Sequence, residues 1–242
     1  MAAVGNPIGA INNYQDMLGR ISWWTGIVSA FVIAFIQYEI PAVNHFVQGL
    51  PAQWSSDTKL EGVTIPLIAL VGGAVVGVIS RATKLHDTLS DWFKIREHYD
   101  VQEILVPLAL GSGAQIALDR FRDMPSKRRE LMKKAFYPYA ITKAEGGFLE
   151  NHLVAMLFDH FFWYWVLLEI CAVAFVAAAV FGFFQVFLWS AALLLFILVA
   201  IWVLQNFMRP MCVTASHDEI RVILDDANRR KAIHDVFDAV LR

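Results

Sequence analysis

The sequence predicts an all-α integral membrane protein, with four transmembrane helices in two hairpins and a cytoplasmic helical domain. Four apolar stretches, each 18 to 23 residues long, are the main observation. At about 1.5 Å of rise per helical residue, each matches a hydrocarbon core of about 30 Å. The chain is 57% hydrophobic and only 17% charged, which argues against a buried soluble bundle because soluble domains carry about 25% charged residues. The stretches are Ile21–Ile40, Val63–Ser80, Phe161–Phe183 and Gln185–Leu204.

The basic residues predict the orientation of these helices. Of the 20 lysines and arginines, 19 lie before the first stretch, between the second and third, or after the fourth, and only Lys59 lies in a predicted outer loop. Basic loops are retained on the cytoplasmic side, so we expect a multi-pass protein of the cytoplasmic (inner) membrane with both termini in the cytoplasm. Trp23 and Trp24 suit an interface anchor, so we interpret the first stretch as a span and not as a cleaved signal peptide.

The same pattern divides the chain into five segments. The outer loop from Pro41 to Gly62 shows no long apolar periodicity and is expected to be a short excursion. The tail has apolar residues at helical spacing among charged ones, so it needs an apolar partner, either the central helices or the same tail of another subunit. The segments are a cytoplasmic N-terminal segment (1–20), hairpin 1 (21–80), a cytoplasmic helical region (81–160), hairpin 2 (161–204) and a cytoplasmic C-terminal helix (205–242).

Local signals place elements within the central region. Ser126 is expected to cap a helix that runs from Lys127 through Phe136. The triplet Gly111–Gly113 predicts a turn, followed by a second helix over 114–121. It does not predict a phosphate-binding loop, because the Lys-Ser/Thr of such loops is absent.

Composition excludes several classes of function. The net charge is only −2, so we expect no nucleic-acid partner. Two cysteines, Cys171 and Cys212, imply no disulfide framework. The sequence contains neither Cys-x-x-Cys nor His-Glu-x-x-His, so we expect no metal and no cofactor.

Glu169 is the membrane-embedded polar candidate. It lies about nine residues into the third stretch, where a charged side chain costs about 2.5 to 3.5 kcal/mol on insertion scales. None of its candidate partners carries a positive charge. We therefore expect either a role in proton or ion passage or in subunit contact, or a hydrogen-bonded structural role. The candidate partners are Thr25, Ser29, Gln185 and Ser190.

Small residues on the second stretch predict close helix packing. Gly73 and Gly77 lie four residues apart, with Gly72 beside them, and such a face lets another backbone approach. The partner helix belongs either to the same chain or to another subunit.

Four polar residues gather where the third stretch meets the cytoplasm, namely Glu150, His152, Asp159 and His160. Asp159 and His160 lie among six aromatic residues within 158–165, which is typical of an aromatic belt at the membrane interface. A metal site on His152 and His160, or a lipid-modifying enzyme at the inner leaflet, is the alternative.

An Arg-x-x-x-x-His spacing resembles that of a helical class of ribonuclease. It occurs from Arg81 to His86 and again from Arg229 to His234. In such an enzyme the arginine and histidine lie together in a cleft, and the histidine acts on a ribose hydroxyl. Arg81 borders the predicted inner membrane surface, where a snorkelling anchor is the simpler interpretation.

We expect a non-enzymatic homo-oligomer whose cytoplasmic domain senses a partner or ligand and alters membrane permeability or assembly. Four spans are few for a pathway formed by one chain, which favours assembly. The organisation is similar to that of small multi-span sensors and effectors of bacterial antiviral defence. One alternative is a membrane anchor that recruits a soluble cytoplasmic protein through Lys127–Arg129, and a further alternative is the membrane-bound enzyme described above.

Overall fold

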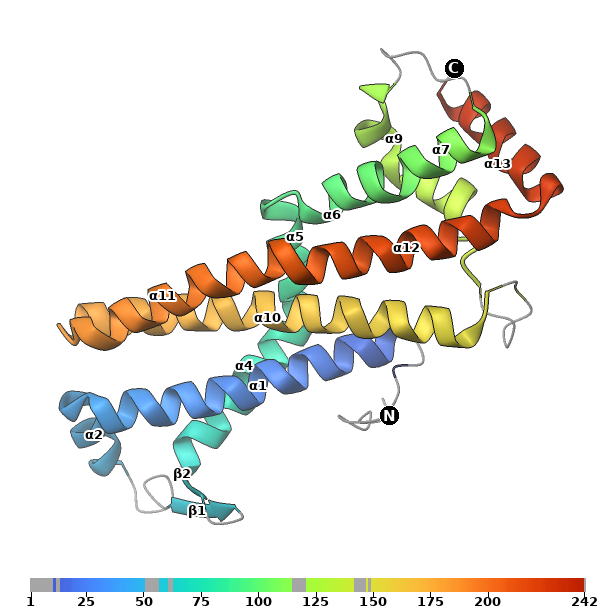
Figure 1. The fold of residues 1–242 in the computed structure, drawn as a ribbon. Helices are drawn as coiled ribbons and strands as arrows, with labels where there is room; N and C mark the ends of the chain where they lie inside the picture. The colour runs from blue at the N-terminus through green and yellow to red at the C-terminus, as the bar shows by residue number, and fades with distance from the viewer. Residues whose placement is uncertain are drawn as a thin grey trace. The chain divides into compact units, whose positions relative to one another are not determined.

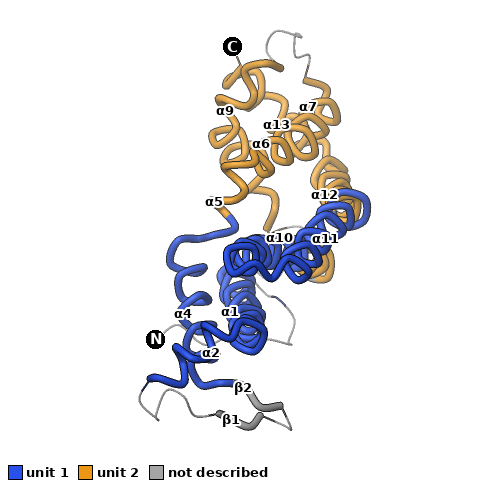
Figure 2. The backbone as a smooth tube through the Cα atoms, turned by 90° about the vertical axis from the view of Figure 1, so that its left-hand side faces the viewer, with its two compact units in different colours: residues 1–86, 161–208 blue, residues 87–160, 209–242 orange. Residues whose placement is uncertain are grey.

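The computed structural model describes residues 11, 14–50, 57–60, 63–114, 121–141, 147 and 149–241. This described part is nearly all helical and contains one short antiparallel strand pair (Figure 1). The chain divides into two compact units, each built from two separate segments (Figure 2). Unit 1 comprises residues 1–86 and 161–208, and unit 2 comprises residues 87–160 and 209–242.

Three helices of the described part are long and apolar enough to cross a membrane. They are α1 (Tyr14–Glu39), α10 (Asn151–Phe183) and the continuous helix that begins with α11 (Phe187–Val203). A fourth is present if α4 (Leu67–Thr83) and α5 (Leu85–Trp92), which meet at a bend of 59°, form one broken span. The prediction of a helical membrane protein is thus confirmed, whereas four spans in two hairpins remain a prediction.

Prolines shift two boundaries from those expected. The helix predicted from Val63 begins at Leu67, because residues Val63–Pro66 form strand β2, which pairs with β1 (Asp57–Leu60). A proline restricts the residue before it to extended backbone, so the helix starts only after Pro66. The outer loop also contains a short helix that its sequence did not predict, α2 (Pro41–Gln48), which starts on a proline.

Helices α1 and α4 pack side by side in unit 1 (Figure 1). A Cβ atom on Gly73 would lie 2.5 Å from the carbonyl oxygen of Gly26, and one on Gly77 would lie 2.8 Å from that of Ser22. Only glycine lets the two backbones approach so closely. The glycine face of the second stretch therefore packs against a helix of the same chain, the first of the two partners that the sequence allowed.

The other end of unit 1 is held by an aromatic cluster and one polar contact. The ring of Phe35 on α1 packs edge-on against Phe181 of α10 and Trp189 of α11, with centroids 5.6 and 4.9 Å apart. The indole N–H of Trp189 donates to Glu39 Oε2 at 2.8 Å. Helices α10 and α11 are joined by a tight turn in which Gln185 has a φ of 62°.

Unit 2 folds around an apolar core to which both of its segments contribute. Ile223, Ile233 and Phe237 from the tail are fully buried in one cluster with Leu105 and Leu108 from the central region. The amphipathic tail thus has the central helices of its own chain as partner. The elements of unit 2, besides most of α5 and the start of α10, are α6 (Ile95–Tyr99), η1 (Asp100–Leu105), α7 (Val106–Ser112), α9 (Met124–Leu131), η2 (Met132–Phe136), α12 (Arg209–Leu224) and α13 (Ala227–Val240).

Two helix ends in unit 2 can be compared with the caps and turns that the sequence predicted. Helix α9 begins at Met124, and Ser126 Oγ donates to the carbonyl of Asp123 instead of capping a later start, so the predicted cap is wrong. A proline at position 125 places the helix start earlier, because proline favours the first helical turn. Gly113 ends α7 with a φ of 79°, as the predicted turn requires. The helix predicted over 114–121 lies mostly outside the described residues.

Candidate functional site

Glu169 lies at the centre of a polar cluster inside unit 1. Its side chain is completely buried. Oε2 accepts hydrogen bonds from Thr25 Oγ1 at 2.6 Å and from Ser80 Oγ at 2.7 Å. Oε1 accepts one from the backbone N–H of His86 at 3.1 Å, and Nδ1 of the same histidine lies 3.4 Å away. We call Thr25, Ser80, His86 and Glu169 the Glu169 centre.

Four different helices supply the Glu169 centre. Thr25 comes from α1, Ser80 from α4 and Glu169 from α10, whereas His86 lies in the first turn of α5. The first N–H groups of a helix have no partner within that helix, and a negative charge there is favoured by the helix dipole. Glu169 therefore does for α5 what a capping side chain does, but from a distant part of the chain.

The bend between α4 and α5 puts His86 within reach of Glu169. Lys84 adopts a left-handed conformation with a φ of 48°, and its N–H caps the end of α4 through the carbonyls of Ser80 and Arg81. The chain turns by 59° there and starts α5 one residue later. Because Glu169 bonds to both Ser80 and His86, it ties the residues on the two sides of the bend together.

The sequence identified Glu169 and one of its partners, Thr25, but missed the other two. Ser80 was the last residue of an apolar stretch, and His86 was considered only for the ribonuclease pattern. The remaining candidate partners do not reach Glu169: Ser190 donates to the carbonyl of Ala178, and Ser29 Oγ is buried without a hydrogen-bond partner among the described residues. A bend between two helices leaves no periodic signal, so the missed partners had no sequence signature.

The two Arg-x-x-x-x-His pairs have separate structural environments. Arg81 is exposed, whereas the His86 side chain is buried against Glu169, with its ring centroid 6.0 Å from that of Trp165. Arg229 donates to the carbonyls of Val222 and Ile223 near the end of α12. The ring of His86 is thus buried and the Arg229 guanidinium is bound to backbone carbonyls, so the geometry does not favour the ribonuclease hypothesis.

The four residues at the start of α10 do not converge on one another. Glu150, His152 and Asp159 are exposed, and His160 Nδ1 is buried without a hydrogen-bond partner in the described part of the chain. Within the described ranges, no group of three or more His, Cys, Asp or Glu side chains is placed to hold a metal ion. A lipid-modifying activity at these residues remains a hypothesis without supporting geometry.

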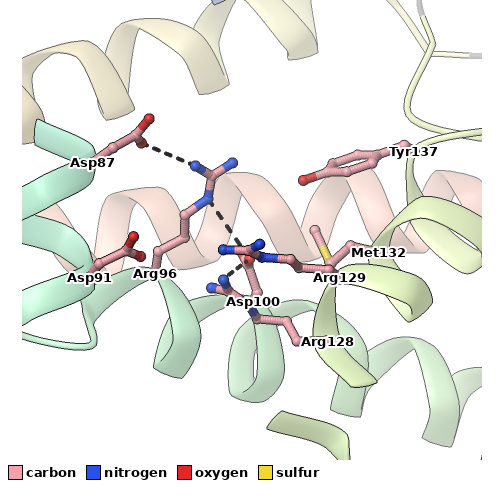
Figure 3. Close-up of a pocket in the computed structure, with 8 residues that line it drawn as sticks. All are labelled: Asp87, Asp91, Arg96, Asp100, Arg128, Arg129, Met132 and Tyr137. Carbon is pink, nitrogen blue, oxygen red and sulfur yellow. Dashed lines mark hydrogen bonds and ion pairs between the residues drawn. The ribbon is translucent and has the colours of Figure 1, made fainter. Parts of the chain in front are cut away.

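A second cluster of charged residues lines a pocket of about 310 Å³ in unit 2 (Figure 3). Arg96 Nη1 lies 3.1 Å from Asp87 Oδ1, and its Nε lies 3.9 Å from Asp100 Oδ2. Arg128 Nη1 approaches the same Asp100 oxygen at 3.3 Å. The lining residues are Asp87, Asp91, Arg96, Asp100, Arg128, Arg129, Met132 and Tyr137. We call this the arginine pocket.

A comparison with known protein families assigns the chain. The model of the YmfE protein family matches residues 13–235. The chain belongs to the YmfE protein family. The YmfE match covers the whole Glu169 centre and the whole arginine pocket, and the family description names no activity, ligand or partner. No curated protein and no solved structure gives a significant match.

Burial controls the charge of Asp100 in this YmfE-family chain. Loss of hydration raises the pKa of Asp100 from 3.8 to about 6, and the opposing attraction of Arg96 and Arg128 offsets this only in part. The carboxyl group therefore takes up a proton close to neutral pH. The arginine pocket contains three arginines and three aspartates, so protonation of Asp100 leaves an excess of one positive charge.

This raised pKa predicts how stability depends on pH. Between about pH 4 and 6, the unfolded chain has released the Asp100 proton and the folded chain has kept it, so stability falls as pH rises. We expect Asp100→Asn, which mimics the protonated form, to remove the Asp100 part of this slope and to raise the free energy of unfolding at pH 7.5 by up to about 3 kcal/mol. The part that remains comes from Glu219, whose pKa burial raises to about 7. Thermal unfolding in detergent between pH 4.5 and 7.5 measures both effects.

The control for this prediction is Asp218→Asn. Asp218 is 41% exposed and pairs with Arg221 at 3.6 Å, so its charge is largely hydrated and its replacement should change neither the slope nor the stability by more than about 0.5 kcal/mol. An Asp100→Asn variant less stable than the wild type at pH 7.5 would show that the contact with Arg128 outweighs the burial of the charge.

Proposed function

We propose that this YmfE-family chain is a non-enzymatic sensor of the cytoplasmic (inner) membrane that works as a homo-oligomer. In this proposal unit 2 lies in the cytoplasm and binds a ligand or partner. Binding changes the packing of the membrane helices and thereby the permeability of the membrane or the assembly of the oligomer. One observation carries it. His86, which binds Glu169, and Asp87, which pairs with Arg96 of the arginine pocket, are consecutive residues of α5.

The pocket holds α5 through two contacts made by one residue. The guanidinium of Arg96 pairs with Asp87, and the backbone N–H of Arg96 donates to Ser90 Oγ at 3.1 Å. A ligand that competes for the guanidinium weakens the first of these contacts. Because α5 is a short helix of eight residues, a displacement at Asp87 is transmitted directly to His86, the residue before it.

The Glu169 centre is sensitive to such a displacement. A completely buried carboxyl group that loses one hydrogen-bond donor is left with an unsatisfied acceptor, at a cost of about 1 to 3 kcal/mol. This energy is similar to the gap that separates two conformations of a switching protein. The lost bond favours any rearrangement of α1, α4 and α10 that supplies a new donor, and this links ligand binding to helix packing.

Two measurements on the full chain test the proposal. The first is the mass of the protein in mild detergent, for which we expect a defined oligomer. The second is release of a dye from liposomes that contain wild type, Glu169→Gln or Asp87→Asn, with Asp218→Asn as the control. We expect both Glu169→Gln and Asp87→Asn to change the rate of release at least severalfold, and the control to match the wild type. A monomer that releases no dye in any variant would rule the proposal out.

A further inference from the structure

The arginine pocket offers its ligand a distinct pattern of charge. Arg96 is engaged by Asp87 and Asp100, and Arg128 lies against Asp100. Arg129 is exposed, and its side chain makes no hydrogen bond or ion pair with any residue that the structure describes. Figure 3 shows the Arg129 guanidinium in the middle of the pocket, so its planar set of donors is open to a ligand.

Tyr137 lines the pocket together with these arginines. Figure 3 shows its hydroxyl group directed toward the arginines, with Met132 beside it and with Asp87 and Asp91 at the opposite end. The negative charge of Asp87 is neutralised by Arg96 at 3.1 Å. When Asp100, which lies 3.3 Å from Arg128, is protonated, the end formed by Arg128, Arg129 and Tyr137 is rich in donors and positive charge. Guanidinium groups match the geometry of tetrahedral oxyanions.

We propose that the arginine pocket binds a small oxyanion of the phosphate class at Arg128, Arg129 and Tyr137, and that binding is linked to uptake of a proton by Asp100. This inference rests on the proposed function, for which it names the ligand class. A pocket of about 310 Å³ accepts a phosphorylated small molecule or a phosphate headgroup. The carboxylate of Asp91 is left to accept a hydroxyl or ammonium group from the rest of that ligand.

Proton linkage follows from the position of Asp100 beneath the arginines. The groups that face its carboxylate are Arg96 from α6 and Arg128 from α9, and the pocket adds Arg129, Tyr137 and the aspartates of α5. An ionised Asp100 repels an incoming anion and occupies Arg128. A protonated Asp100 does neither, because the charge is removed and Arg128 is released toward the pocket. Since its pKa is about 6, anion binding should strengthen as pH falls toward that value.

Sulfate is the best first probe, because it remains a dianion across this pH range whereas phosphate itself titrates. The full chain in nanodiscs of phosphatidylcholine is melted at increasing sulfate concentration at pH 5.5 and pH 7.5. We expect stabilisation at both, with half-saturation at a severalfold lower concentration at pH 5.5. Asp100→Asn should bind equally at the two pH values, and Arg129→Ala should weaken binding about tenfold. Arg230→Ala, an exposed arginine on α13, is the matched control.

Further measurements distinguish a free phosphate from a lipid headgroup, and a failure of this inference from a failure of the proposed function. If inorganic phosphate stabilises the protein in phosphatidylcholine discs, the pocket takes a free phosphate; if only discs with phosphatidic acid do so, and Arg129→Ala removes the effect, it takes a headgroup. Equal responses of wild type and Arg129→Ala to every anion overturn this inference. If anions bind but dye release does not change, the oxyanion site stands and the sensor function is contradicted. If Asp87→Asn alters dye release but no anion binds, the sensor function stands and the oxyanion site is contradicted.

Discussion

We expect Glu169→Ala to lower the free energy of unfolding of unit 1 by at least about 3 kcal/mol. The substitution removes the acceptor of three hydrogen bonds at a completely buried position, and each unsatisfied buried donor costs about 1 to 3 kcal/mol. The hydroxyls of Thr25 and Ser80 recover part of this by rotating toward carbonyls of their own helices. The N–H of His86 has no such freedom, because it is fixed to the backbone at the start of α5.

A variant that also removes the two hydroxyl donors, and leaves only the N–H of His86 unpaired, tests this explanation. Thr25→Val, Ser80→Ala and Glu169→Leu together replace the polar cluster by apolar side chains, and such paired replacement of polar groups is often nearly neutral. We expect the triple variant to be more stable than Glu169→Ala. Thermal unfolding in detergent, followed by the loss of helical circular dichroism, measures both. A triple variant that is less stable than Glu169→Ala would mean that the hydroxyls contribute independently of Glu169, which contradicts a shared centre.

The second large effect is expected at the contact of α1 with α4. In Gly73→Ala the new methyl group would lie 2.5 Å from the carbonyl oxygen of Gly26 and 2.6 Å from the Cβ of Ala30. Both neighbours are rigid parts of α1, so the helices must separate along their contact and lose close packing. We expect a loss of about 2 to 4 kcal/mol, at the upper end of what overpacking of a core produces.

Gly72→Ala is the matched control for this prediction. It makes the same chemical change one residue away, but its methyl group would meet only the tip of the Ile33 side chain, at 2.7 Å. A flexible side chain can change rotamer, so we expect a change of less than about 1 kcal/mol. Melting temperatures and oligomeric mass are measured together. If Gly73→Ala alters the oligomer and leaves the stability of each chain unchanged, the glycine face serves contacts between subunits and the assignment to α1 fails.

The sequence predicted those features that depend only on residues close together in the chain. The three longest apolar stretches were predicted because a hydrocarbon core requires a long run of apolar residues and the chain shows that run directly. Helices α1 and α10 nevertheless begin seven and ten residues before the predicted starts, at Tyr14 and Asn151. Glu169 was identified for the converse reason, since a lone charge in such a run is costly and therefore conspicuous. The later start of α4 at Leu67 and the short helix α2 in the outer loop both follow from prolines, whose effect on the start of a helix does not appear in a hydropathy pattern.

Partner choice was decided by the tertiary structure. The sequence left open whether the glycines of the second stretch and the apolar face of the tail serve the same chain or another, because packing depends on which surfaces meet and not on the spacing within one helix. The arginine pocket was invisible for the same reason: its charged residues lie at 87–100 and 128–129, and nothing local marks two such segments as neighbours.

Taken by itself, the sequence determined that this chain enters a membrane, where its long apolar helices lie, and that Glu169 needs partners. Only the tertiary structure decided who those partners are, since a left-handed residue at Lys84 turns the chain and brings the N–H of His86 to a carboxylate 83 positions away. Hydrophobic transfer energy depends on composition along the chain and can be read from it. Hydrogen bonds and ion pairs depend on distances of about 3 Å between atoms, which only the folded backbone defines.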